Sequence, residues 1–300
     1  MGVTGMPSSG EAGLPAISVV IPAYNEERAI TAQIREVAQV LEASGRASEI
    51  IVVDDGSTDG TGDCAAREGV EVIRLPQNTG YGNAVKRGIA ASRYDWVLIT
   101  DADGTYPAEA IPRLLAHIPD HDMVVGARTG EEVHIPLIRR PAKWFLRRLA
   151  ILLARHPIPD LNSGLRIMRK PVVQRFENIL PQGFSFVTTI TLAMLSNGYR
   201  VAYEPIDYRR RIGSSKIRPT DTVRFLIQIL EVSLLFQPLR IFLPLGAVLA
   251  VAGGLMLLRD LLSSGLSGTP VACLLGAALI WCLGLLAHRN AQRIKMGGRR

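Results

Sequence analysis

The sequence predicts an α/β fold of the Rossmann-like kind, followed by a hairpin of two helices long enough to cross a membrane. Short runs rich in Val and Ile alternate with helical stretches over the first 125 residues. Two uninterrupted apolar stretches lie near the C-terminus. The hydrophobic content of 48% is high for a purely soluble protein. A chain of 300 residues has room for one large domain or two small ones.

Five apolar runs are predicted to form strands. Because polar residues do not alternate within them, these strands should be buried on both faces, as in a parallel sheet. The helical stretches between them favour right-handed βαβ units, whose ligands bind at the carboxyl ends of the strands. The strands are expected at Ile17–Ile21, Glu49–Val53, Val70–Arg74, Tyr94–Thr100 and His121–Val125, and the helices at Glu26–Ala43, Thr58–Glu68 and Tyr81–Ser92.

The chain divides into segments of different composition. Residues 1–15 are rich in Gly and Ser without an apolar run, which predicts a disordered tail rather than a signal peptide. The catalytic domain is expected over 16–215. Within it, 136–159 mixes aromatic and paired basic residues, so it forms either a helix at the membrane surface or an ordinary helix on the sheet. A juxtamembrane helix is expected within 216–238.

The two apolar stretches, 239–258 and 271–287, each approach the roughly 20 residues that span a bilayer. Basic residues precede the first stretch and follow the second, in the tail 288–300. The positive-inside rule therefore predicts a two-pass protein of the cytoplasmic membrane, with the catalytic domain and the tail in the cytoplasm. A buried helical hairpin in a soluble protein is the alternative.

The charge and cysteine content narrow the classes of partner. The net charge is +7, and the basic residues adjoin apolar runs while aromatic residues make up only 6%. This pattern favours anionic lipid headgroups over nucleic acid. Cys64, Cys273 and Cys282 form no CxxC pair, which disfavours a disulfide framework or a zinc site.

An Asp-x-Asp motif, Asp101 and Asp103, directly follows a predicted buried strand. Two carboxylates one residue apart can share Mg²⁺ or Mn²⁺, which prefer oxygen ligands and leave positions for phosphate. Such a cation offsets the negative charge that develops on a diphosphate leaving group. The motif alone also occurs in ordinary surface turns, and its place at a strand end is what favours the metal site.

Two further strand ends carry candidate binding residues. At the second strand, Asp54 or Asp55 can accept the ring N–H of a uracil or guanine, or the pair can simply cap the turn and helix. At the first strand, Pro22 and Tyr24 precede Glu26. The Tyr24 ring can stack on a base or ribose, whereas an acidic residue at Glu26 also suits the first turn of a helix.

Seven motifs appear in a characteristic order and together cover about residues 17–224. They are Val19–Glu26, Val52–Asp59, Asn78–Gly80, Asp101–Asp103, Val125–Arg128, Asp160–Arg166 and Arg211–Lys216. The first four resemble inverting family-2 glycosyltransferases of the GT-A fold. The last three, with the apolar tail, resemble dolichyl-phosphate mannose synthases and bacterial polyprenyl-phosphate glycosyltransferases.

The resemblance implies a role for each matching residue. Residues that hold the nucleotide-sugar would be Pro22, Tyr24, Glu26, Asp54, Asp55, Asp101 and Arg128, with Asp101 and Asp103 also binding the metal. Residues assigned to catalysis would be Asp103, Asp160, Arg211 and Lys216, with both basic residues and Arg128 contacting phosphates. Some relatives carry a Gln as a further metal ligand where this chain has Thr105.

The implied reaction transfers a hexose from a GDP- or UDP-sugar to a polyprenyl phosphate, with inversion. The acceptor phosphate has a second pKa of about 6, so it needs a strong general base less than a sugar hydroxyl does. The guanidinium group of Arg can donate two parallel hydrogen bonds to a phosphate, which suits it to position the phosphates of donor and acceptor. Arg209–Arg224 can instead mark only the cytoplasmic side, and Asp160 can cap a loop rather than orient the acceptor. A QxxRW motif of processive synthases is absent, which favours a single transfer.

Two other functions stay open. The acceptor can be a hydroxyl of a lipid-linked glycan, or the chain can be a catalytically silent nucleotide-sugar-binding partner in a membrane complex. The sequence identifies neither the sugar nor the nucleotide. Self-association of the two apolar helices into a homo-oligomer is a further open question.

Overall fold

The computed structural model describes residues 14–133, 148–152, 156–209, 221–263 and 267–297. Nearly all of the predicted tail 1–15 lies outside these ranges. So do most of segment 136–159 and two predicted phosphate-binding residues, Arg211 and Lys216.

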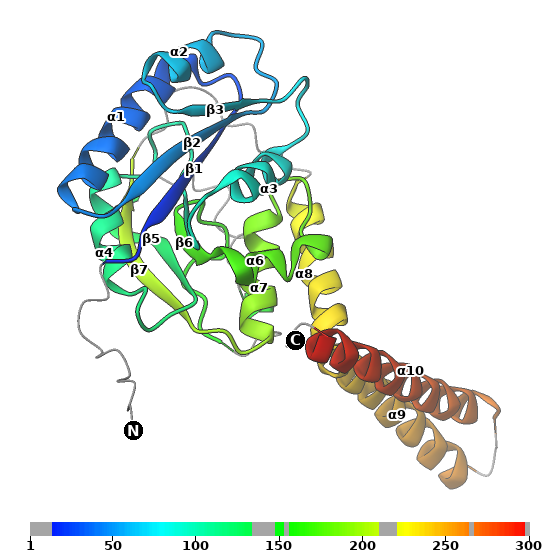
Figure 1. Ribbon diagram of the computed structural model, residues 1–300. Helices are drawn as coiled ribbons and strands as arrows, with labels where there is room; N and C mark the ends of the chain where they lie inside the picture. Colours follow the sequence, from blue (N-terminus) through cyan, green and yellow to red (C-terminus); the bar gives the residue numbers. More distant parts are fainter. Residues whose placement is uncertain (1–13, 134–147, 153–155, 210–220, 264–266, 298–300) are drawn as a thin grey trace, which may run out of the picture.

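A seven-stranded mixed sheet forms the centre of the N-terminal domain, in the order β3-β2-β1-β4-β6-β5-β7 (Figure 1). Six of these strands run in one direction, and β6 is antiparallel to both of its neighbours. The five predicted strands are therefore all parallel, and neither β6 nor β7 was predicted. The strands are β1 (Ile17–Ala23), β2 (Ser48–Asp54), β3 (Glu71–Arg74), β4 (Trp96–Ile99), β5 (Met123–Val133), β6 (Arg166–Arg169) and β7 (Val201–Tyr208).

Helices cover both faces of the sheet, which is why its central strands are apolar on both sides. On one face, Val20 and Val53 pack in a cluster with α3, α6, α7 and α8. On the other, Val19 and Ile21 pack with α1, α2 and α4. These helices are α1 (Glu27–Ala43), α2 (Thr61–Arg67), α3 (Tyr81–Ala91), α4 (Ile111–Ala116), α6 (Lys170–Gln174), α7 (Phe186–Ser196) and α8 (Asp221–Phe236).

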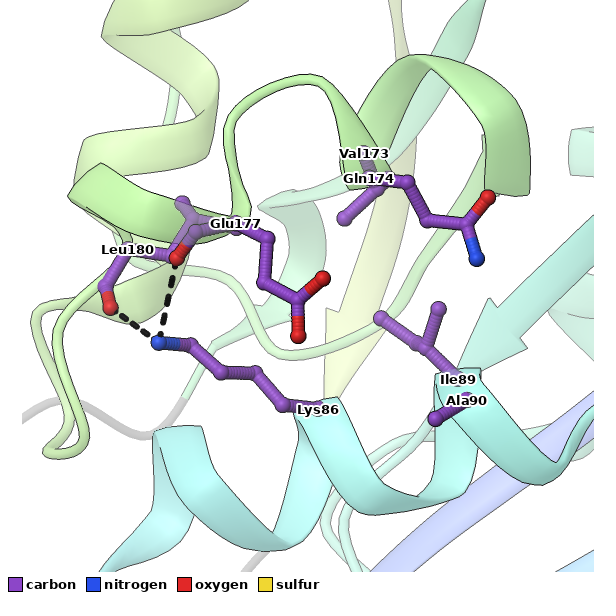
Figure 2. Close-up of a pocket in the computed structure, with 7 residues that line it drawn as sticks. All are labelled: Lys86, Ile89, Ala90, Val173, Gln174, Glu177 and Leu180. Carbon is purple, nitrogen blue, oxygen red and sulfur yellow. Dashed lines mark hydrogen bonds between the residues drawn. The ribbon is translucent and has the colours of Figure 1, made fainter.

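The loop that follows α6 is fixed to α3 (Figure 2). The Lys86 ammonium donates hydrogen bonds to the backbone carbonyls of Glu177, at 3.3 Å, and Leu180. Near the start of α3, the backbone N–H of Asn83 donates to the backbone carbonyl of Gln182 at 3.0 Å. The space between the two elements measures only about 20 Å³, roughly enough for one water, so this is a packing contact rather than a ligand site.

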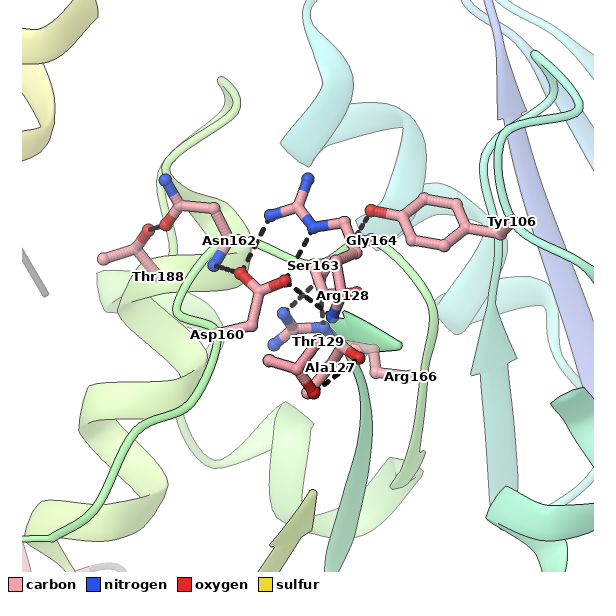
Figure 3. A network of polar contacts seen from close by, with 10 residues as sticks. All are labelled: Tyr106, Ala127, Arg128, Thr129, Asp160, Asn162, Ser163, Gly164, Arg166 and Thr188. Carbon is pink, nitrogen blue, oxygen red and sulfur yellow. Dashed lines mark hydrogen bonds and ion pairs between the residues drawn. The ribbon is translucent and has the colours of Figure 1, made fainter. Parts of the chain in front are cut away.

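A buried ion pair joins the middle of β5 to the loop before β6 (Figure 3). Arg128 donates from Nε and Nη2 to the two carboxylate oxygens of Asp160, at 2.6 and 2.8 Å. The two side chains are only 9% and 12% exposed. Burial by itself raises the pKa of the Asp160 carboxyl, but the Arg128 guanidinium and the backbone donors outweigh burial, so the pKa lies well below its usual range.

A second buried guanidinium holds the same loop from its other end. Arg166 is fully buried, and it donates to the Ser163 carbonyl at 3.2 Å, the Val187 carbonyl at 3.0 Å and the Thr191 hydroxyl at 3.0 Å. Val187 and Thr191 belong to α7. The loop 160–166 is therefore anchored to β5 at one end and to α7 at the other.

Two long helices, α9 (Leu239–Leu262) and α10 (Thr269–Gly297), form a hairpin that extends away from the sheet domain (Figure 1). Both are longer than predicted, and both are long and apolar enough to cross a membrane. Only 11% and 17% of their most apolar windows are buried. Their apolar side chains therefore face outwards, which argues against the buried hairpin of a soluble protein.

Close contacts at glycines hold the two helices together. Gly246 lies against the indole of Trp281, and Gly284 lies against Phe242. The indole N–H of Trp281 also donates to the Leu243 carbonyl at 3.2 Å. Small residues let two apolar helices approach closely enough to pack in lipid.

Replacing Asp160 by Asn is expected to lower the free energy of unfolding by about 3–5 kcal/mol, because the buried Arg128 guanidinium then loses its counter-charge. The pKa of the carboxyl is depressed in the fold. Its contribution is therefore present above the unfolded pKa of about 3.9 and is lost as the pH falls below that value. Denaturant unfolding of the detergent-solubilised chain, at neutral and at acid pH, measures both effects.

Asp63→Asn is the matched control. Asp63 pairs with Arg74 at 2.6 Å, but the side chains are 64% and 54% exposed, and such pairs contribute about 0–1 kcal/mol. Equal losses of stability in the two variants would contradict the role assigned to the buried pair.

Candidate active site

A cleft of about 570 Å³ lies at the carboxyl ends of β1, β2 and β4, where the direction of these strands predicts ligand binding. Six residues predicted from the sequence line it, although up to about 80 positions separate them along the chain. These six are Pro22, Tyr24, Glu26, Asp55, Asp101 and Asp103. The lining also includes Asn78, Gly80, Tyr81 and Phe184.

The turn after β1 is bound to the turn after β2. Asn25 has a positive φ of 52°, a conformation that Asn tolerates better than most residues. The backbone N–H of Asn25 donates to the Ser57 hydroxyl at 2.9 Å, and the backbone N–H of Glu26 donates to the Thr61 hydroxyl at 2.8 Å. These bonds fix the backbone on either side of Asn25 and so hold Tyr24 and Glu26 at the cleft. Sequence reasoning did not single out Asn25.

Asp54 and Asp55 occupy different environments. One oxygen of Asp55 accepts from the amide and hydroxyl of Thr79, at 2.8 and 2.7 Å, and the other accepts from the Gly80 amide at 2.9 Å. Asp55 thus lines the cleft and also holds its wall. Asp54 lies outside the cleft lining and accepts from the Ser57 amide at 3.0 Å, a placement that fits the turn-capping alternative.

Asp101 and Asp103 follow β4 and lie together in the cleft. The amide and hydroxyl of Thr105 donate to one oxygen of Asp103, at 3.1 and 2.6 Å. Thr105, at the position where some relatives carry a metal ligand, therefore positions Asp103. The backbone carbonyl of Thr105 accepts from the backbone N–H of Arg209 at 2.9 Å, so the end of β7 reaches the site. Arg211 and Lys216 lie beyond Arg209, outside the described residues.

Arg128 and Asp160 lie outside the lining of the cleft and bind each other, as described above. The Arg128 guanidinium also lies 5.1 Å from the centre of the Tyr208 ring. The predicted contacts of Arg128 with phosphate and of Asp160 with the acceptor remain predictions. What the geometry shows is that Asp160 binds Arg128 and accepts from the Asn162 backbone N–H, so it also helps to hold the loop 160–166.

Two aromatic residues in the cleft escaped sequence reasoning. The rings of Tyr81 and Phe184 stack at 5.5 Å with an interplanar angle of 22°. Burial, together with the neighbouring Asp101 carboxylate, raises the pKa of the Tyr81 phenol well above its usual range. Phe184 belongs to a loop between two apolar segments, where an aromatic residue carries no signal that distinguishes a ligand contact from a core residue.

Comparison with known proteins connects this site to a family. Residues 18–176 match the family model described as Glycosyl transferase family 2. Residues 237–289 match the model described as GtrB C-terminal hairpin. The first match covers most of the sheet domain, including every residue that lines the cleft except Phe184. The second match covers most of the apolar hairpin.

Two curated relatives are similar to this chain. A dolichyl-phosphate hexose transferase of Haloferax volcanii is 36% identical over 68% of this chain and 87% of its own. An undecaprenyl-phosphate 4-deoxy-4-formamido-L-arabinose transferase of Salmonella paratyphi B is 27% identical over 81% of this chain and 74% of its own.

Among solved structures, a glucosyl-3-phosphoglycerate synthase from Mycobacterium tuberculosis, in complex with Mn²⁺, UDP and phosphoglyceric acid, superposes with a TM-score of 0.60. Its sequence is 22% identical, over 73% of this chain and 78% of that one. At this identity the likeness concerns the fold, and it confirms the predicted GT-A fold, whose sheet is mixed rather than purely parallel. With the family match and the relatives, it shows that the chain belongs to glycosyltransferase family 2 and is an enzyme of the transferase class.

Proposed function

We propose that this enzyme transfers a hexose from a GDP- or UDP-sugar to a polyprenyl phosphate, with inversion at the anomeric carbon. The observation that carries the proposal is the cleft itself. It brings Asp101 and Asp103 together with Tyr24 and Asp55, on a domain attached to an outward-facing apolar hairpin. The names of the relatives, which are polyprenyl-phosphate sugar transferases, support the same acceptor class.

The residues of the cleft fit a divalent metal. Mg²⁺ and Mn²⁺ prefer carboxylate oxygens and are often held by one or two carboxylates together with substrate phosphates. Asp101 and Asp103 supply such a pair. Over the described part of the chain, no cluster of three or more His, Cys, Asp or Glu residues is arranged to hold a metal. When bound, the cation would neutralise charge on the leaving diphosphate.

The protein residues would then position two anions. Tyr24 and Asp55 would hold the nucleoside, while Arg211 and Lys216 would contact phosphates of the donor or acceptor. The segment that contains Arg211 and Lys216 begins where the Arg209 amide binds Thr105, two residues from Asp103. A phosphate monoester is mostly ionised at neutral pH, so its oxygen attacks the anomeric carbon without a dedicated general base.

The membrane arrangement belongs to the same proposal. The hairpin would cross the cytoplasmic membrane twice, with the cleft on the cytoplasmic side, because basic residues flank both of its ends. Surface-exposed Leu and Val side chains over α9 and α10 support contact with lipid. The acceptor phosphate would then meet the donor at the cytoplasmic leaflet.

A tight contact connects the anchored loop to the proposed metal site. A Cβ atom at Gly164 would lie 2.8 and 2.9 Å from the two carboxylate oxygens of Asp101. The Gly164 amide donates to the Tyr106 hydroxyl at 2.6 Å, and Tyr106 is buried. The loop 160–166 therefore presses against Asp101 at a residue that has no side chain.

Gly164→Ala is expected to lower the transfer rate by about 10- to 100-fold, because the added methyl group displaces the Asp101 carboxylate. The transfer rate and the unfolding midpoint measure the effect. Gly254→Ala, in α9 and away from the cleft, is the matched control, since nothing lies within 4 Å of a Cβ at that position. Equal rates in the two variants would contradict the assigned role of the contact.

A donor screen tests the reaction. The detergent-purified chain, with Mn²⁺ and polyprenyl phosphate, is offered radiolabelled UDP-glucose, GDP-mannose and related donors one at a time. Label from one donor is expected in the lipid phase. Asp103→Asn should abolish transfer, because it removes a charge from the metal pair while keeping the size of the side chain. Asp63→Asn, on the exposed surface, is the control and should leave transfer intact.

The alternatives give different results. Metal-dependent donor binding without transfer to any acceptor would support a silent nucleotide-sugar-binding partner. Transfer to a lipid-linked glycan but not to polyprenyl phosphate would support a hydroxyl acceptor, which needs a general base. Either result would overturn the proposed acceptor.

A further inference from the structure

An aromatic ring is exposed inside the cleft. Phe184 is 39% exposed, although it lies in the loop directly before the buried helix α7. One of its faces stacks on Tyr81, and both residues line the cleft together with Asp101 and Asp103. The proposed reaction so far gives this ring no role.

Contacts with α3 hold the loop that contains Phe184 in place. Lys86 and Asn83 of α3 fix the backbone carbonyls that precede it, as Figure 2 shows for Lys86. A Cβ at Gly80 would lie only 2.7 Å from the Gln182 carbonyl oxygen, so the loop packs directly on the backbone of α3. Because the loop and Tyr81 are both fixed, Phe184 presents a pre-organised apolar surface to the cleft.

The position of the ring indicates which part of a substrate would reach it. Asp101 and Asp103 mark the site of the diphosphate, and the hexose of a nucleotide-sugar is bonded directly to that diphosphate. Tyr81, on which Phe184 stacks, lines the cleft together with Asp101 and Asp103. The ring therefore lies in the cleft that would hold the diphosphate and the hexose bonded to it.

We propose that Phe184, supported by Tyr81, is a platform for the hexose ring of the donor. The face of an aromatic ring is electron-rich, and the axial C–H bonds on one face of a pyranose point partially positive hydrogens towards it. Contact with that face would orient the sugar so that the anomeric carbon faces the acceptor. This inference rests on the proposed nucleotide-sugar donor and extends it to a residue that selects and orients the sugar.

Binding measurements isolate the sugar contact. Isothermal titration calorimetry with Mn²⁺ compares UDP-glucose with UDP, and GDP-mannose with GDP, on the full chain. In Phe184→Leu and Phe184→Ala, affinity for the nucleotide-sugar is expected to fall by about 2- to 10-fold, a range typical of aromatic contacts. Affinity for the matching nucleoside diphosphate should not change. Phe184→Tyr keeps the aromatic face and should bind as the wild-type chain does.

The outcomes separate this inference from the proposed function. If the wild-type chain binds a nucleotide-sugar and Phe184→Leu binds it equally well, the platform is overturned while the proposed function stands. An equal loss for sugar-bearing and sugar-free nucleotides would also overturn it, since the ring would then shape the cleft generally. A raised KM for polyprenyl phosphate with unchanged donor affinity would assign the ring to the lipid instead. If no nucleotide-sugar binds the wild-type chain, both proposals fail.

Discussion

Four carboxylates, Glu26, Asp55, Asp101 and Asp103, line one cleft, and their mutual repulsion is the constraint that the surrounding structure has to meet. The fold offsets this repulsion with donors at fixed positions. Asp55 accepts three hydrogen bonds from Thr79 and Gly80, and Asp103 accepts two from Thr105. The donors are backbone amides and hydroxyls, which stabilise a carboxylate without adding an opposite full charge. In the proposed function, a divalent cation bound by Asp101 and Asp103 would offset the remaining repulsion.

The position of the cleft residues depends on buried charged groups that do not line the cleft. The Arg128–Asp160 pair and the buried Arg166 hold the two ends of one loop, and that loop meets Asp101 at Gly164. A buried ion pair is a weak source of net stability, because desolvation costs about as much as the attraction returns. Its more useful property here is geometric, since a bidentate guanidinium fixes direction as well as distance. The charged pair thus sets the position of a backbone segment against Asp101, one of the two proposed metal ligands.

The sequence predicted the fold and the cleft wherever the signal was local. Asp101 and Asp103 follow an apolar run directly, and a rule about strand ends was enough to place them beside Asp55. It missed α7, whose residues are buried almost all round, because such a helix has no apolar periodicity to detect. It also separated Arg128 from Asp160, since a contact between residues 32 positions apart depends on tertiary packing. Phe184 was missed for the same reason, because only the fold of the 177–184 loop brings it to the cleft.

The tip of the helical hairpin has a consequence for how the protein enters a membrane. The Asp260 carboxylate accepts hydrogen bonds from the amide and hydroxyl of Ser267, at 3.0 and 2.6 Å, and from Arg259. Among the described residues at the turn, Arg259, Asp260 and Ser267 therefore bind one another within the hairpin. For a hairpin that spans a bilayer, a self-contained tip reduces the cost of carrying a carboxylate across the hydrocarbon layer. The helices α9 and α10 would then enter the membrane together, as one hairpin, rather than independently of each other.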